Sequence, residues 1–381
     1  MEALINVTNN EVMNVKENEV KENAISVKVS TEAKQVAWKA ASNCKSFATP
    51  VTINEAVEAI GADYEVKKEY LVKVPSALVE SIKSGQPYAG LNLTQNDIIT
   101  SHMATVREDL GNVLGVVGAK YGVVQNKKAF EFIDIITSGQ LGGEQKPIIE
   151  TAGILDNGGR IYVTAKMPKN LYIDGEHSEG INDYILFTNT HDGTGAVTVL
   201  FTPIRVICQN TLNAALRNAQ NKLIFKHTSR VGERMDWERE ENMQKAVAVL
   251  KMHETFKEEF LKQLYNLGQQ KVTDIDKMDF AANIMASPAQ VKLLKLANYN
   301  LDAVEEIGTR TKNNINSLLH SIESGVGQNE FRGTKLWLYN GLTTYLNNDR
   351  KYKSEDDKLD SLILGGDGQK KAQKGFDILA A

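Results

Sequence analysis

Apolar and polar residues alternate along much of the chain between positions 65 and 208, and a period of two predicts β-strands. Three stretches predict β-hairpins because alternating residues flank a short turn: 105–118, 148–167 and 183–208. The second has an Asp-Asn-Gly-Gly turn, which tolerates positive φ, and the third a His-Asp-Gly-Thr-Gly turn. Pro203 cannot donate a ladder hydrogen bond, so the strand there should lie at a sheet edge or bend.

Helical spacing of apolar residues appears at two places in the N-terminal half. Residues 51–64 predict a short helix with Asn54 as N-cap and Gly61 as its stop, followed by a strand at EYLVKV. Between the first two hairpins a second helix is predicted, with Asn126 as N-cap and Gly139 as its stop. This order predicts an α+β fold in which antiparallel β-hairpins form a sheet packed with helices.

The rest of the chain predicts a mainly α-helical C-terminal half. Helices are expected over residues 209–221, 232–269, 276–300, 301–324 and 334–348. We therefore expect a disordered or loosely ordered acidic leader, an α+β core domain, a helical region and a polar C-terminal tail with one apolar island. These cover residues 1–35, 36–230, 231–350 and 351–381, respectively.

Composition narrows the function classes. The chain has 381 residues, of which 42% are hydrophobic and 24% charged, as in globular proteins. A formal net charge of −4 argues against a globally basic nucleic-acid binder but leaves room for a local basic patch. Two isolated cysteines make neither a disulfide framework nor a zinc site and fit a reducing compartment. No apolar stretch is long enough to predict a membrane span.

The common catalytic motifs are absent from the sequence. It has no P-loop, no Rossmann glycine fingerprint, no H-E-x-x-H, no C-x-x-C and no nucleophile elbow. We therefore expect no catalytic residues, no metal and no cofactor. The pair His191-Asp192 is the one candidate for a metal or acid–base site, as in a nuclease or other hydrolase. The alternative is a β-turn in which the Asp192 side chain bonds its own backbone ahead of Gly193.

Polar groups cluster where the third hairpin ends. Arg205 lies in an otherwise apolar strand, where a charge is costly unless it is paired or faces the surface. It could meet a phosphate or form a salt bridge to a neighbouring strand. Gln209 and Asn210 begin the next predicted helix, where amides and free N–H groups suit an anion, although Asn210 could act only as an N-cap.

The most basic segment of the chain follows directly. Its cations are Arg217, Lys222, Lys226, Arg230 and Arg234, and only Glu233 opposes them. Cations with an interleaved aromatic suit a nucleic-acid backbone and a stacked base. The alternative is a solvated connection between two helices, since runs of charge are usually solvated.

Five separated blocks carry a family resemblance. They are YGVVQNKKAFEF at 121–132, ETAGIL at 150–155, TNTHDG at 188–193, TPIRVICQNTLNAAL at 202–216 and WLYNGLTTY at 337–345. In this order they resemble the phage/plasmid-like protein family, a domain-of-unknown-function family of bacteriophages, plasmids and prophages, over roughly residues 45–375. The resemblance implies a mobile-element origin and a product of the host bacterial cytoplasm. It supplies no catalytic residues.

The order of hairpins, helix and basic residues is also similar to the single-strand annealing recombinases of phages. That resemblance implies single-stranded DNA as a partner, homo-oligomers and no use of ATP, by analogy at the level of the fold alone. We therefore expect a mobile-element protein that binds nucleic acid without catalysis, with single-strand annealing as its activity. The alternative is a protein–protein interaction module that acts on a host factor such as a defence system, since the net charge is acidic and the helical half is long.

Overall fold

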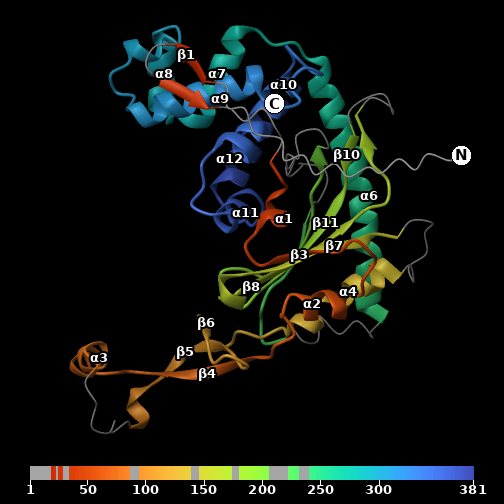
Figure 1. The fold of residues 1–381 in the computed structure, drawn as a ribbon, viewed down its shortest axis with the longest axis vertical. Coiled ribbons are helices and arrows are strands. Elements are labelled where there is room, and N and C mark those ends of the chain that lie inside the picture. The colour runs from red at the N-terminus through yellow and green to blue at the C-terminus, as the bar shows by residue number, and fades with distance from the viewer. Residues whose placement is uncertain are drawn as a thin grey trace, which may run out of the picture.

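The fold combines antiparallel sheets with a mostly helical C-terminal half, which confirms the predicted α+β class (Figure 1). It is taken from a computed structural model that describes residues 19–22, 25–28, 34–85, 94–138, 146–173, 180–205, 222–230 and 240–381. Among these residues, no helix combines the length and the apolar character needed to cross a bilayer.

A six-stranded antiparallel sheet lies at the centre, in the order β14-β12-β11-β8-β7-β3. Its strands are β3 (Cys44–Ser46), β7 (Ile148–Leu155), β8 (Arg160–Lys166), β11 (Tyr184–Thr190), β12 (Val197–Phe201) and β14 (Lys222–Phe225). The pairs β7–β8 and β11–β12 confirm two predicted hairpins. Asn157 in the first turn has φ 55° and Gly193 in the second has φ 81°, so both turns use the positive φ that their sequences allow.

Helices cover both faces of this sheet. The helices on one face are α1 (Ala37–Ala40), α11 (Glu355–Ile363) and α12 (Asp367–Ala380), and those on the other are α2 (Ile53–Ala59), α4 (Asn126–Ser138) and α6 (Glu240–Gln269) (Figure 1). On the first face the Tyr162 hydroxyl donates to the carbonyl of Trp38 in α1, at 2.6 Å. On the second, the ring of Phe201 packs against Phe256 of α6, with centroids 6.1 Å apart. Strand β11 is therefore buried along its whole length.

The chain bends where Pro203 predicted a bend. Strand β12 ends at Phe201, and the next strand, β13 (Ile204–Arg205), pairs with β10 (Gly180–Asn182) in a second sheet. Strand β9 (Leu171–Tyr172) completes that sheet.

A third sheet forms an arm that projects from the body (Figure 1). It contains β4 (Val66–Val72), β5 (Ile98–Arg107) and β6 (Val113–Gly118), and helix α3 (Ser76–Lys83) lies near its far end. Strands β5 and β6 form the predicted hairpin at 105–118. The arm meets the body at the turn after β11, where the Thr105 hydroxyl donates to the His191 carbonyl at 2.6 Å. A Cβ on Gly115 would lie 2.5 Å from Cα of Asp192, so only glycine fits this contact.

The helical half contains one more helix than predicted between residues 276 and 300. The helices are α7 (Asp274–Met285), α8 (Pro288–Leu296), α9 (Thr309–Ser324) and α10 (Lys335–Thr344), followed by a π-helical turn over Tyr345–Asp349. The expected single helix is wrong because Ser287 caps a new helix in a capping box with Gln290, and Pro288 occupies its first position. Residues 301–324 likewise form a short 3₁₀ turn and then α9.

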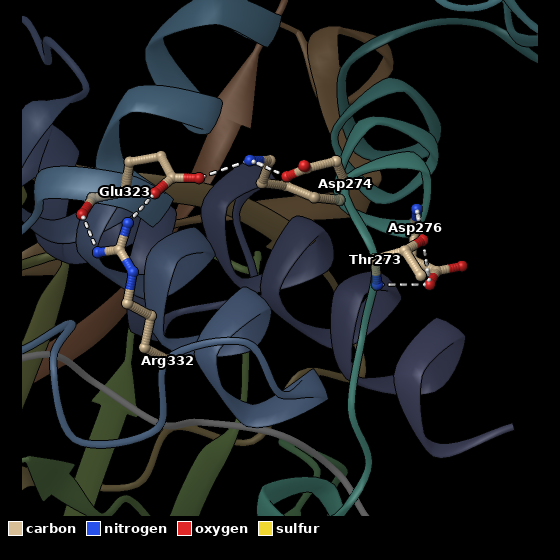
Figure 2. A network of polar contacts seen from close by, with 6 residues as sticks. Thr273, Asp274, Asp276, Glu323 and Arg332 are labelled. Atoms are coloured by element: carbon tan, nitrogen blue, oxygen red, sulfur yellow. Dashed lines mark hydrogen bonds and ion pairs between the residues drawn. The ribbon is translucent and has the colours of Figure 1, made fainter.

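One polar network joins α7 to α9, and a local cap begins α7 (Figure 2). Lys277 contacts Asp274 at 2.9 Å and Glu323 of α9 at 2.5 Å, and Arg332 binds the other oxygen of Glu323 at 2.5 Å. The Thr273 hydroxyl accepts from the Asp276 amide and so caps α7. Trp337 of α10 is buried beneath these cations, which fits the role of a packing anchor.

The segment expected to be a polar tail folds into two packed helices. Residues 351–381 form α11 and α12, whose buried side chains include Leu359, Leu362, Ala372, Phe376 and Leu379. The apolar island at Leu359 is therefore part of the core. The polar residues around it cover its outer surface.

The first predicted helix is confirmed as α2, but its cap is Thr52 and not Asn54. Thr52 and Glu55 form a capping box, while Gly61 stops the helix with φ 68° as expected. In the leader, the structure describes an antiparallel pair, β1 (Glu19–Glu22) with β2 (Ile25–Lys28), and residues 34–35. The proposed domain boundaries stay predictions.

Candidate nucleic-acid interface

Of the predicted cationic stripe, the structure describes residues 222–230. This part begins with strand β14, which was not predicted from the sequence. Strand β14 is the outer strand of the central sheet and pairs with β12. Lys222, Lys226 and Arg230 are exposed. Lys222–Phe225 is therefore an edge strand of the sheet, and the residues on both sides of the described part of the stripe, including the predicted helix over 209–221, lie outside the described residues.

A groove of about 700 Å³ runs between this edge and helix α12. Lys222 lines it from the sheet, and Lys370 and Lys374 line it from the helix. The two helix lysines are four residues apart, so they lie on one face of α12. Asp377 is the one acidic side chain in the lining, and it accepts a hydrogen bond from Gln373 at 2.9 Å. The charged side chains of the lining are therefore three lysines and one aspartate, and the Lys374 ammonium also donates to the Asn283 carbonyl of α7.

Some cations of the stripe and of the groove form no ion pair with a carboxylate of the described residues, unlike other lysines of the chain. Lys39 and Lys128, for example, are paired with glutamates at 2.9 and 2.7 Å. By contrast, Lys226, Arg230 and Lys370 have no carboxylate partner in the part of the chain that the structure describes. Such cations can contact a phosphate without first breaking an internal pair.

The groove opens at one end into a smaller cavity of about 190 Å³. The two share Leu200, Lys222, Gly365 and Gln369 in their linings. The floor of the cavity is the first face of the sheet and its roof is the loop between α11 and α12. The polar side chains of the lining are threonines, Tyr162, Gln369, Arg160 and Lys222, and the other side chains are apolar. Arg160 is engaged by Asp192 at 3.0 Å and by Asp360.

Arg205 lies away from this surface. Its side chain is 1% exposed, and Nη2 donates to the carbonyl of Gly327, between α9 and α10, at 3.1 Å. The expectation that Arg205 meets a phosphate is corrected by this burial, because a phosphate cannot reach the guanidinium in this arrangement. Of the other predicted contacts, Gln209, Asn210, Arg217 and Arg234 lie outside the described residues.

The pair His191-Asp192 forms a turn, as its second interpretation predicted. The Asp192 carboxylate accepts from the Thr194 amide at 2.8 Å and hydroxyl at 2.7 Å, and also from Arg160. Although burial opposes it, these hydrogen bonds lower the pKa of Asp192. The arm also packs against this turn, through the hydrogen bond from Thr105 to the His191 carbonyl. These structural contacts explain the geometry of the turn without a ligand.

The His191 ring points into a buried polar network. Its Nε2 lies 2.8 Å from Oδ1 of Asn126 and 3.3 Å from the amide of Asn189. Burial, aided by nearby His227, lowers the pKa of His191 to about 3, so the ring is neutral near pH 7. Asn126 is the first residue of α4 and not the expected N-cap, and its side chain is engaged by His191 and by the Ala62 carbonyl. Among the described residues, no group of three His, Cys, Asp or Glu side chains could hold a metal.

Sequence reasoning missed the α12 wall of the groove. The signal was present, because Ala372, Phe376 and Leu379 recur at helical spacing on one side of the lysines. The small number of apolar residues in this segment favoured a tail.

Comparison with known proteins places the chain in a family. No curated protein and no solved structure matches it. A family model described as a domain of unknown function, DUF932, matches residues 113–363, well over half of the chain. The match runs from β6 to the end of α11 and includes the central hairpins and β14. The chain therefore belongs to the DUF932 family.

Proposed function

We propose that this protein binds single-stranded nucleic acid, without catalysis, along the groove between β14 and α12. The observation that carries the proposal is the convergence of Lys222 with Lys370 and Lys374 on one groove, from segments far apart in the sequence. Lys226 and Arg230 are exposed beyond the far end of β14 from Lys222, outside the lining of the groove. The chain is acidic overall, so the local excess of lysines marks this surface for an anionic partner.

A phosphate backbone is the anion that suits a row of separate cations. Each lysine that neutralises a phosphate releases condensed counterions, and this release drives binding and makes it dependent on salt. A single strand also has unpaired bases that can enter apolar recesses beside the backbone track. The cavity at the head of the groove is such a recess.

Fluorescence-anisotropy titrations with a labelled single-stranded oligonucleotide, at several salt concentrations, test the proposal. Affinity should fall linearly with salt on logarithmic axes, and each lost phosphate contact should reduce the slope by about 0.7. Reversing Lys222, Lys226 and Arg230 together to Glu should abolish binding. The single reversal Lys222→Glu has Lys292→Glu, an exposed position on α8 away from the groove, as its matched control. No binding at low salt, or equal loss in the control, would refute the assignment.

Four finer proposals follow from the resemblance to phage/plasmid-like proteins and to annealing recombinases. The protein would originate from a phage or another mobile element and work in the host bacterial cytoplasm. It would assemble into homo-oligomers and anneal complementary strands without ATP. An annealing assay with complementary oligonucleotides, together with electron microscopy for rings, addresses both properties. Monomeric protein with no annealing would restrict the function to strand binding.

The arm favours a second candidate function, contact with another protein. Among its exposed large apolar side chains are Tyr70 at 71%, Val113 at 63% and Val116 at 55%. None of the residues of α3 is buried. Exposed apolar groups on a projecting element often mark protein contacts. Sedimentation tests for a second copy of the chain as the partner, and host-lysate pull-downs test for a host factor. Tyr70→Glu and Val116→Glu should abolish whichever association is observed.

A further inference from the structure

The cavity at the head of the groove has the size and the lining of a site for one ring. Its volume is about 190 Å³, and a cavity of about 150 Å³ lined by apolar side chains is enough to hold one benzene ring. Leu186 and Leu200 contribute to the floor, and Ile363 and Leu364 to the roof. An apolar enclosure with a few polar groups is typical of sites for planar ligands.

One of its polar groups has an unused hydrogen-bonding capacity. Thr190 is 7% exposed, and its Oγ1 is buried with no hydrogen-bond partner among the residues that the structure describes. Strand alternation places Thr190 on the same face of β11 as Leu186 and Thr188, which is the face that lines the cavity. A buried hydroxyl without a partner is costly, so a ligand with edge donors or acceptors would satisfy it.

The charge of the site changes from neutral to cationic toward its mouth. Arg160, which also lines the cavity, is already bound by the carboxylates of Asp192 and Asp360. Lys222 lies where the cavity joins the groove, and Lys370 lines the groove beyond it. A ligand that fits both parts has an uncharged heterocycle at one end and phosphate at the other, which is the chemistry of a nucleotide.

We infer that the cavity accepts a single nucleobase, with the phosphate of the same nucleotide held at Lys222. The inference rests on the proposed function in one respect, since the nucleotide could belong to a strand lying in the groove. A free nucleotide has the same chemistry, so the experiment separates the two sources.

The test uses the fluorescent base 2-aminopurine, in a short single-stranded oligonucleotide and as the free nucleotide. A base that leaves its stacked neighbours for the cavity should change its emission in a saturable way. A dye at the end of the strand reports strand binding independently through anisotropy. The full chain is titrated into each probe.

Two matched pairs of variants locate the base. Thr190→Val should weaken the affinity read from the base signal about fivefold, because one hydrogen bond is lost. Thr202→Val is its control and should have no effect, since it removes another buried hydroxyl that has no partner among the described residues but lies outside the cavity. Ile224→Trp should close the mouth of the cavity and remove the signal. Ile148→Trp makes the same change at the same 45% exposure on β7, away from the cavity.

The outcomes separate this inference from the proposed function. Strand binding without a base signal, or equal effects in both members of each pair, would overturn the nucleobase site and leave the proposed function intact. A signal with the free nucleotide but no strand binding would support the site and overturn the proposed function. Base signals from both probes, lost in Ile224→Trp, are the expected result. No base signal from either probe, together with no change in the anisotropy of the strand, would overturn both.

Discussion

Mild acid should destabilise the fold through the buried ring of His191. The ring is fully buried, and its Nε2 is engaged by the amides of Asn126 and Asn189. Its Nδ1 has no partner among the described residues, so a proton added there would create a buried charge without a hydrogen-bond acceptor. The folded chain therefore keeps this ring neutral.

The size of the effect follows from the two pKa values. The His191 pKa is about 3 in the folded chain, against an ordinary value of 6.5. Between these values the unfolded chain binds a proton at this ring and the folded chain does not, so the free energy of unfolding decreases as the pH falls. Each pH unit below the ordinary value costs about 1.4 kcal/mol, so the loss is about 2 kcal/mol at about pH 5. Below the folded pKa both states are protonated and the dependence ends.

Urea denaturation at about pH 7.5 and about pH 5 measures this loss, with His191→Gln as the comparison. The decrease in the free energy of unfolding should be about 2 kcal/mol smaller in the variant than in the unmodified chain. His227, whose pKa burial also lowers, is present in both chains and cancels. Equal decreases in both proteins would show that the ring is accessible to protons, and would refute the buried network.

Three further substitutions test the packing. Gly115→Ala should cost about 1–3 kcal/mol in thermal denaturation because its Cβ would meet the backbone of the turn after β11, whereas Gly118→Ala, with open space around it, should be nearly neutral. Phe376→Ala should cost about 3–5 kcal/mol if α12 is part of the core, and the half-exposed Ile378→Ala much less. Thr273→Ala removes the cap of α7 and should cost about 1 kcal/mol by urea denaturation. Equal losses in either matched pair, or none at Thr273, would contradict the described contacts.

The features that could be predicted from the sequence are those with local causes. The turns after β7 and β11 were predictable because glycine and asparagine permit positive φ within the turn itself. The bend at Pro203 was predictable because proline lacks the donor that a continued strand needs. The break between α7 and α8 was also signalled locally, by Ser287 and Pro288, but the long apolar pattern around them favoured one helix.

The features that were missed depend on distant partners. Strand β14 has only four residues, and its pairing with β12 across the intervening chain determines its structure. Asn126 has the residue type of a helix cap, yet the ring of His191 and the carbonyl of Ala62 engage its amide. Arg205 gave no local sign of whether it faces solvent, because its burial depends on contact with the α9–α10 connection.

The groove shows how a binding surface can depend on the core beneath it. Phe376 and Leu379 anchor α12 in the core, so Lys370 on the opposite side of the helix lines the groove that β14 also lines. Loss of the anchor should therefore reduce strand binding together with stability, whereas Lys370→Glu should reduce binding and leave stability unchanged. Measuring affinity and thermal stability in Phe376→Ala and Lys370→Glu separates the two effects. If Lys370→Glu bound the strand as tightly as the unmodified chain, α12 would be a structural helix only, and the interface would be confined to the edge formed by β14.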